Sequence, residues 1–149
     1  MCIRDSLYCL PFKNNLTQTT NFAIDFDDTT AGHFKCMLVD SSYTPNFDTD
    51  SVKTDVSGEI VGAGYTAGGE ALTSVTFTIS SGTITWDAAD VTWSASTITN
   101  AAAAVIYNTS ETNDPLIAYV DFGGNFSTTS GTFQIVWNAS GIFTLDLTP

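Results

Sequence analysis

The chain is poor in basic residues and has a single histidine. Lys and Arg contribute 4 of its 149 residues and Asp and Glu contribute 16, so the net charge is −12 at pH 7. Proteins that bind nucleic acid by neutralising phosphates need the opposite balance, and so do proteins that dock on anionic lipid through a basic patch. The composition therefore predicts a protein that binds neither nucleic acid nor a membrane surface.

Cysteine is also scarce, and its spacing excludes the common metal and redox motifs. Cys2, Cys9 and Cys36 include no Cys-x-x-Cys pair, and the lone His33 supplies no zinc-binding pattern. Two alternatives stay open for the thiols. Either Cys9 and Cys36 form a disulfide, or the cysteines are free thiols in a reducing cytosol.

Long hydrophobic runs are missing. No stretch approaches the length of about 18 apolar residues that spans a bilayer. The apolar segment 7–10 is too short for a secretory signal peptide, and Pro11 and Lys13 interrupt it. We expect neither a transmembrane segment nor an export signal in this sequence.

What the chain does have is alternation of apolar and polar residues, which is typical of strands. A short helix is expected only at 7–16. The alanine-rich segment 101–107 favours helix locally, but Val105, Ile106 and Tyr107 favour a buried strand, which is our prediction. Strands are expected at 22–26, 34–39, 72–79, 83–86, 91–98, 101–107, 116–122 (ended by Gly123 and Gly124), 133–137 and 143–147, with at best a bulged strand at 59–65.

About nine or ten short strands with frequent turns indicate an all-β protein, an antiparallel β-sandwich that is jelly-roll-like or Ig-like. Residues 1–6 share no periodicity with the residues after them and resemble the translation of a sequencing adapter. We therefore expect residues 1–6 to be a non-native segment in place of a longer natural N-terminus. Residues 7–149 are expected to form a single β-sandwich domain.

Catalytic motifs are weak. Only His33 could activate a nucleophile, and no Gly-x-Ser-x-Gly turn accompanies it. Paired carboxylates could hydrolyse glycosides, but acidic residues in turns more often cap the backbone. The carboxylates considered for such a pair are Asp25, Asp27, Asp28, Asp87, Asp90 and Asp121. We predict that the protein is not an enzyme.

The loop 40–57 is the longest irregular stretch, and loops carry function on β scaffolds. Its Asp48, Asp50 and Asp55 suggest calcium, but they lack the spacing of an EF-hand. We favour a solvated acidic loop without a cofactor, with calcium as the alternative. Together with the loop 108–114, it is the expected contact region, and the candidate interaction residues are Tyr43, Phe47, Asp48, Asp50 and Tyr65.

The tryptophans Trp86, Trp93 and Trp137 are in phase with Ile and Val neighbours, which favours core packing over an exposed sugar-binding platform.

Four segments taken together resemble a family of uncharacterised virion structural proteins of tailed phages. They are Gly-Tyr-Thr-Ala-Gly-Gly at 64–69, Trp-Asp-Ala-Ala-Asp-Val-Thr-Trp-Ser at 86–94, Ala-Val-Ile-Tyr at 104–107 with Pro-Leu-Ile-Ala-Tyr-Val-Asp-Phe-Gly-Gly at 115–124, and Gly-Thr-Phe-Gln-Ile-Val-Trp at 131–137. The chain departs from the family in its alanine-rich run before Val105, where relatives carry a basic residue beside an aromatic one. The family has no agreed catalytic residues to transfer.

The resemblance implies a non-enzymatic part of the virion, assembled in the cytoplasm of the bacterial host. We expect a capsid decoration (cement) protein that acts by adhesion to other virion proteins and forms a homo-oligomer. The alternative is a tail or tail-fibre module that binds host-surface glycans. That alternative predicts exposed Tyr43, Phe47 and Tyr65 beside carboxylates or calcium. A hydrolase that uses two aspartates is the third hypothesis.

Overall fold

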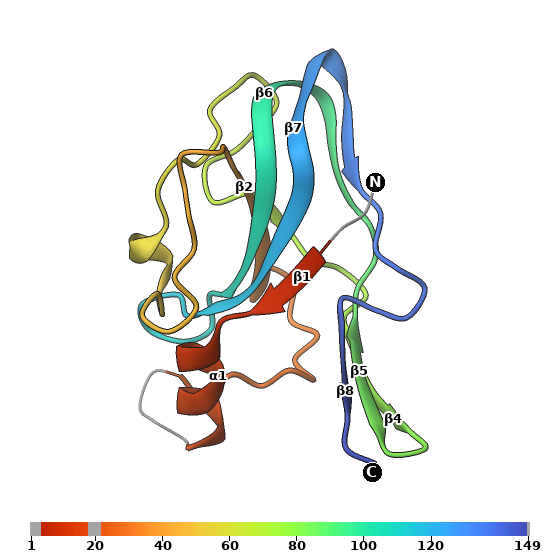
Figure 1. Ribbon diagram of the computed structural model, residues 1–149. Coiled ribbons are helices and arrows are strands. Elements are labelled where there is room, and N and C mark those ends of the chain that lie inside the picture. Colours follow the sequence, from red (N-terminus) through yellow and green to blue (C-terminus); the bar gives the residue numbers. More distant parts are fainter. Residues whose placement is uncertain (1–3, 18–21, 149) are drawn as a thin grey trace.

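The structure is a computed structural model that describes residues 4–17 and 22–148 (Figure 1). Two antiparallel sheets pack against each other, which confirms the prediction of an all-β sandwich with a short helix. The strand orders are β1-β7-β6-β2-β3 and β4-β5-β8. The elements are β1 (Arg4–Leu7), α1 (Cys9–Leu16), β2 (Phe34–Val39), the 3-10 turn η1 (Lys53–Asp55), β3 (Glu70–Ala71), β4 (Thr76–Ser80), β5 (Thr83–Asp87), β6 (Val91–Asn108), β7 (Leu116–Ile135) and β8 (Phe143–Asp146).

The prediction of many short strands is wrong for β6 and β7, which are single long strands. They form a ribbon that rises along the sheet and curls back on itself (Figure 1). The pairing register shifts at several points along the ribbon, and bulges of this kind bend a strand without ending it. Positive φ angles mark them at Ala95, Asn100, Gly123 and Ser130. The glycines predicted to end a strand at 123–124 therefore lie within β7, and eight strands are found in the described residues.

Two further predicted strands are absent from the described residues. The segment 22–26 pairs with no strand. Side chains bond its backbone instead: the Ile24 carbonyl accepts a hydrogen bond from Asn15, and the Phe26 carbonyl accepts one from Trp86. The segment 59–65 makes only an isolated bridge, from Glu59 to Val39. The strand predicted at 72–79 begins only at Thr76.

Two apolar clusters lie on opposite faces of the five-stranded sheet. The larger fills the sandwich and contains Trp86, Trp93 and Trp137, as predicted from their phase. The smaller lies under the loop 40–57, where Met37 and Val105 pack with Tyr8 and Tyr43. Burial on both faces explains why β2 and the second half of β6 are apolar at nearly every position.

The backbone of residues 4–6 belongs to β1, which pairs antiparallel with β7 from Arg4 opposite Asp121 to Leu7 opposite Ala118. Main-chain groups make the hydrogen bonds of this pairing, so the pairing does not show whether these residues are native. The non-native origin of residues 1–6 therefore stays a prediction. The helix α1 follows directly, and no helix in the described part of the chain is long and apolar enough to cross a membrane.

Of the two alternatives for the thiols, the disulfide between Cys9 and Cys36 is wrong, because both thiols are free. Cys9 is exposed on α1, whereas Cys36 is fully buried in β2, and burial raises the pKa of its thiol. The reactive species of a cysteine is its thiolate. We expect iodoacetamide to modify Cys9 in the native protein and Cys36 only after unfolding, as read by peptide mass spectrometry. Equal rates at the two sites would contradict this burial.

Candidate functional site

The three-stranded sheet carries two rows of apolar side chains on one face. Alternation along each strand and the pairing register place Phe77, Trp86 and Phe143 side by side in the first row. The next row toward the β4-β5 turn follows the same rule. It consists of Ile79, Ile84 and Leu145.

The first row anchors the sheet to the body of the protein. Trp86 is fully buried, and its indole Nε1 donates a hydrogen bond of 3.1 Å to the Phe26 carbonyl. The Phe26 ring lies 5.6 Å from Trp86, 5.9 Å from Phe77 and 5.8 Å from Phe143, centroid to centroid. These aromatic contacts join the base of the sheet to the body of the protein.

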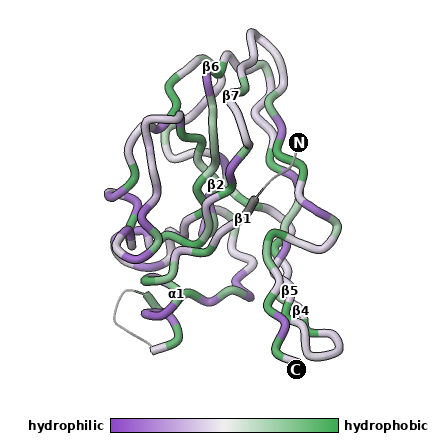
Figure 2. The backbone as a smooth tube through the Cα atoms, viewed as in Figure 1, coloured by the Kyte–Doolittle hydropathy of each residue, from purple (hydrophilic) through white to green (hydrophobic). Residues whose placement is uncertain are grey.

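The second row has no such cover. Ile79 is 72% exposed and Leu145 is 36% exposed, and Leu147 beyond the end of β8 is 62% exposed. Single exposed apolar residues are ordinary, but a contiguous group of them marks an interaction surface. The three-stranded sheet projects from the body (Figure 1), and hydrophobic stretches follow the projecting strands in Figure 2. The pairing register places the second row next to the β4-β5 turn.

The apolar face forms the floor of a groove that we call the α1 groove. Its floor comes from Phe77, Ile84, Phe143 and Leu145, and the facing wall comes from α1 and the segment 24–27. The groove has a volume of about 380 Å³. The wall residues are Phe12, Asn15, Leu16, Ile24, Asp25, Phe26 and Asp27.

The charged side chains that line the α1 groove are all acidic. Asp25 and Asp27 are exposed at its rim, and Asp25 accepts a hydrogen bond from the Asp27 amide. No lysine or arginine of the described residues lines it. The groove therefore combines an apolar floor with a negative rim.

The aromatic residues expected to be exposed lie elsewhere and are covered. Tyr43 is buried, and its hydroxyl lies 2.7 Å from the Tyr8 hydroxyl and donates to Asp50 at 2.9 Å. Phe47 is half-buried against Tyr8. Tyr65 is half-buried, stacks on Trp93 and donates to Glu59. Burial raises the pKa of the hydroxyls of Tyr8, Tyr43 and Tyr65. These side chains build the protein's interior rather than a sugar-binding platform.

The acidic residues of the loop 40–57 stabilise the loop through hydrogen bonds and do not gather into one site. Asp50 accepts hydrogen bonds from the Asn46 amide and Tyr43, and Asp55 accepts them from the amides of Ser51 and Val52. Asp48 is exposed. In the described part of the chain, no group of three His, Cys, Asp or Glu side chains could hold a metal ion. The loop covers the smaller apolar cluster, so it lies on the other side of the five-stranded sheet from the sandwich interior.

Four of the six carboxylates considered for catalysis, Asp25, Asp28, Asp90 and Asp121, cap the backbone in the same way, whereas the Oδ1 of Asp87 is buried without a hydrogen-bond partner. Asp90 accepts from the Trp137 amide and Asp121 from the Gly123 amide. Asp28 accepts from the Thr30 amide, and its carboxylate lies 2.5 Å from the Nδ1 of His33. The contacts of these side chains stabilise turns and bring no nucleophile to His33.

The pair of Asp28 and His33 makes a pH-dependent contribution to stability. The hydrogen bond from His33, together with those from Thr30, lowers the pKa of Asp28 to about 2. A carboxyl whose pKa is lowered by folding stabilises the protein above its unfolded value, and this stabilisation is lost as the pH falls toward 2. We expect Asp28→Asn to reduce the loss of unfolding free energy between pH 4 and pH 2, measured by urea denaturation. The same loss in variant and native protein would contradict the assignment.

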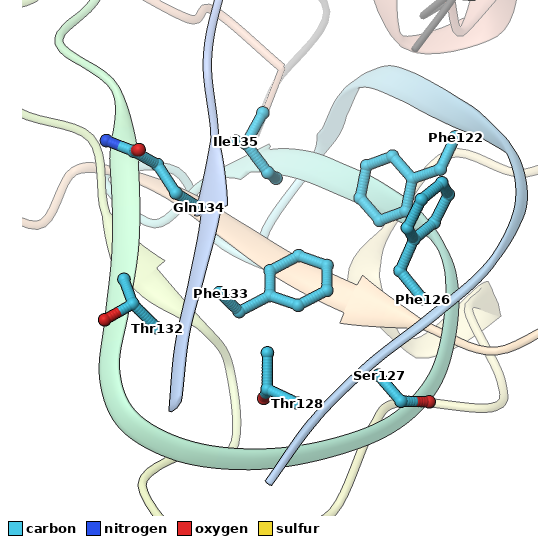
Figure 3. Close-up of a pocket in the computed structure, with 8 residues that line it drawn as sticks. All are labelled: Phe122, Phe126, Ser127, Thr128, Thr132, Phe133, Gln134 and Ile135. Atoms are coloured by element: carbon cyan, nitrogen blue, oxygen red, sulfur yellow. The ribbon is translucent and has the colours of Figure 1, made fainter. Parts of the chain in front are cut away.

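A second hollow lies where β7 curls back on itself, and we call it the Phe126 pocket. Figure 3 shows Phe122 and Phe126 from one half of the bend gathered near Phe133 from the other. The pocket has a volume of about 210 Å³, its lining is uncharged, and Phe126 is 41% exposed. Polar side chains complete the lining at Ser127, Thr128, Thr132 and Gln134.

Neither hollow was identified from the sequence, because both depend on which strands end up side by side. One signal for the exposed apolar row was present. Ile79 immediately precedes the Ser-Ser-Gly turn at 80–82, so an apolar side chain lies at the tip of a hairpin where little chain is left to cover it. The chain matches no protein-family model, no curated protein and no solved structure, so its surfaces and its sequence carry the functional argument.

Proposed function

We propose that the protein is a virion structural protein of a tailed phage, most simply a capsid decoration protein that acts by adhesion to neighbouring virion proteins. The observation that supports adhesion best is the apolar row Ile79, Ile84 and Leu145, in which Ile79 is 72% and Leu145 is 36% exposed, on a sheet joined to the body by aromatic contacts at its base. Interfaces concentrate their binding energy in such apolar anchors surrounded by polar residues. The resemblance of the chain to virion proteins of tailed phages supports the proposal that the protein is part of a virion.

The test uses capsids of a phage that encodes a protein of the resembling family. We expect saturable binding of the purified protein and a raised melting temperature of the shell. The double variant Ile79→Ser, Leu147→Ser should bind at least about tenfold more weakly, since buried apolar anchors each contribute above about 1 kcal/mol. Both side chains are largely exposed, so folding should be unaffected.

Val61→Ser is the matched control, because Val61 is 92% exposed and lies outside the three-stranded sheet. It should bind capsids like the unaltered protein. Capsid binding that is equally insensitive to both variants would exclude the exposed apolar end of the three-stranded sheet as the adhesive surface. Absence of capsid binding by the unaltered protein would refute the decoration function.

The Phe126 pocket supports a second candidate function, glycan binding by a tail or tail-fibre module. An exposed aromatic ring with neutral hydrogen-bonding side chains around it suits the apolar face and hydroxyls of a sugar. This function predicts retention on host-surface glycans that Phe126→Ser abolishes and that the Ile79→Ser, Leu147→Ser variant leaves intact. Retention insensitive to Phe126→Ser would exclude this pocket as the glycan site.

A further inference from the structure

We infer that the α1 groove binds a short segment of a partner protein in which neighbouring apolar side chains are flanked by lysine or arginine. This inference rests on the proposed adhesive function and names the chemistry of its partner. The floor and the rim of the groove supply two independent requirements that an occupant must meet.

The floor requires apolar side chains. The floor consists of the apolar side chains of Phe77, Ile84, Phe143 and Leu145. Those of Phe12 and Leu16 on α1 line the facing wall. A volume of about 380 Å³ lies within the range of about 300–1,000 Å³ typical of binding sites. An occupant without apolar groups would leave Leu145 and Leu16 in water, and Leu16 is already 69% exposed. Burial of these side chains supplies the affinity.

The rim requires positive charge. Asp25 and Asp27 both line the groove and are exposed to solvent. Neither carboxylate has an ion-pair partner among the described residues. Lys13 lies on α1 but does not line the groove, and Lys35 and Lys53 lie near Gly68 and Tyr107, outside the groove lining. A partner with basic side chains next to its apolar anchors would complement this rim and be selected over an acidic competitor.

The same charges disfavour a second copy of this chain as the occupant. Each copy carries a net charge of −12, and a symmetric contact through the groove would bring one acidic rim against another. Like charges held close together oppose association. A basic, apolar segment of a different protein meets both requirements without this cost.

The experiment uses three labelled synthetic peptides: Lys-Lys-Leu-Ser-Ile-Lys-Lys, the same peptide with glutamate for lysine, and the same peptide with serine for both apolar residues. Binding is measured by fluorescence anisotropy, and the site is mapped by amide chemical shifts. We expect only the first peptide to bind, with shifts at Ile84 and Leu145, and binding to weaken as salt is raised.

Variants separate the two requirements. Leu145→Ser should weaken binding of the first peptide about tenfold. Asp27→Asn should weaken it about twofold to fivefold, as expected for an exposed charge pair. Asp48→Asn is the matched control, because Asp48 is an exposed loop carboxylate outside the groove, and it should have no effect.

Each other outcome overturns the inference. It is wrong if no peptide binds, if the acidic peptide binds as tightly as the basic one, or if the shifts map elsewhere. The capsid assay keeps the two proposals apart. Capsid binding that requires Ile79 without any peptide binding refutes the partner chemistry alone, whereas specific peptide binding without capsid binding refutes the decoration function alone.

Discussion

Trp86→Ala should lower the free energy of unfolding by about 4 kcal/mol, the middle of the range for removing a large buried aromatic side chain. Trp86 is fully buried, and its ring lies 5.2 Å from that of Phe34 and 5.4 Å from that of Phe143, centroid to centroid. The substitution also leaves the Phe26 carbonyl without the indole donor. Urea denaturation followed by circular dichroism measures the effect.

Ile79→Ala provides the comparison, because Ile79 lies on the same face of the same sheet but is 72% exposed. Its cost should be within about 0.5 kcal/mol, as for other exposed positions. The difference between the two variants separates the first row, which joins the sheet to the body, from the second row, which is left free for a partner. A cost below about 1 kcal/mol for Trp86→Ala would show that the two sheets do not depend on this contact.

Gly69→Ala should destabilise the protein by about 2–5 kcal/mol, the sum expected for backbone strain and steric overlap. Gly69 has a φ of +74°, and an added Cβ would overlap the Cys36 carbonyl oxygen and lie 2.5 Å from the Met37 Cα. Both obstacles are backbone atoms of β2, which cannot rotate away. The turn that Gly69 closes with Thr66 also leads into β3. Thermal and urea denaturation would both report the loss.

Gly124→Ala is the matched control on the long strand β7. An added Cβ there meets nothing within 4 Å, and the φ angle of Gly124 is not in the left-handed region. We expect it to be neutral or slightly stabilising, because alanine restricts the unfolded chain more than glycine does. Similar losses for the two variants would show that the close approach of the turn to β2 is not what requires glycine at 69.

The fold class was predictable because it depends on local patterns. The apolar run at 34–39 identified β2, alternation at 83–86 and 143–147 identified β5 and β8, and the turn at 80–82 identified the hairpin of β4 and β5. The number and length of strands were not predictable, because Gly123 looks the same in a sequence whether it ends a strand or forms a bulge within one. The pairing of β7 with β6 decides whether Gly123 ends a strand or lies in a bulge, and this pairing joins residues far apart in the chain.

The candidate sites were less predictable than the fold. Tyr43 and Tyr65 are aromatic residues in loops, and only the packing of those loops onto the sheet shows that both are covered. Ile79 and Leu145 follow the pattern of core residues, and only the projection of their sheet beyond the body shows that they are uncovered. Hydropathy patterns identify the apolar face of a strand but not what lies against it.

The sequence by itself determined the strongly negative charge, the all-β class, the burial of the tryptophans and the acidic turns, because each follows from composition or from neighbours in the chain. The tertiary structure decided that β6 and β7 curl as one ribbon, that Cys9 and Cys36 stay apart, and that α1 faces an uncovered sheet across a groove. The physical reason is that the exposure of a side chain depends on the whole tertiary arrangement. A side chain is buried or free according to which distant elements the fold brings over it.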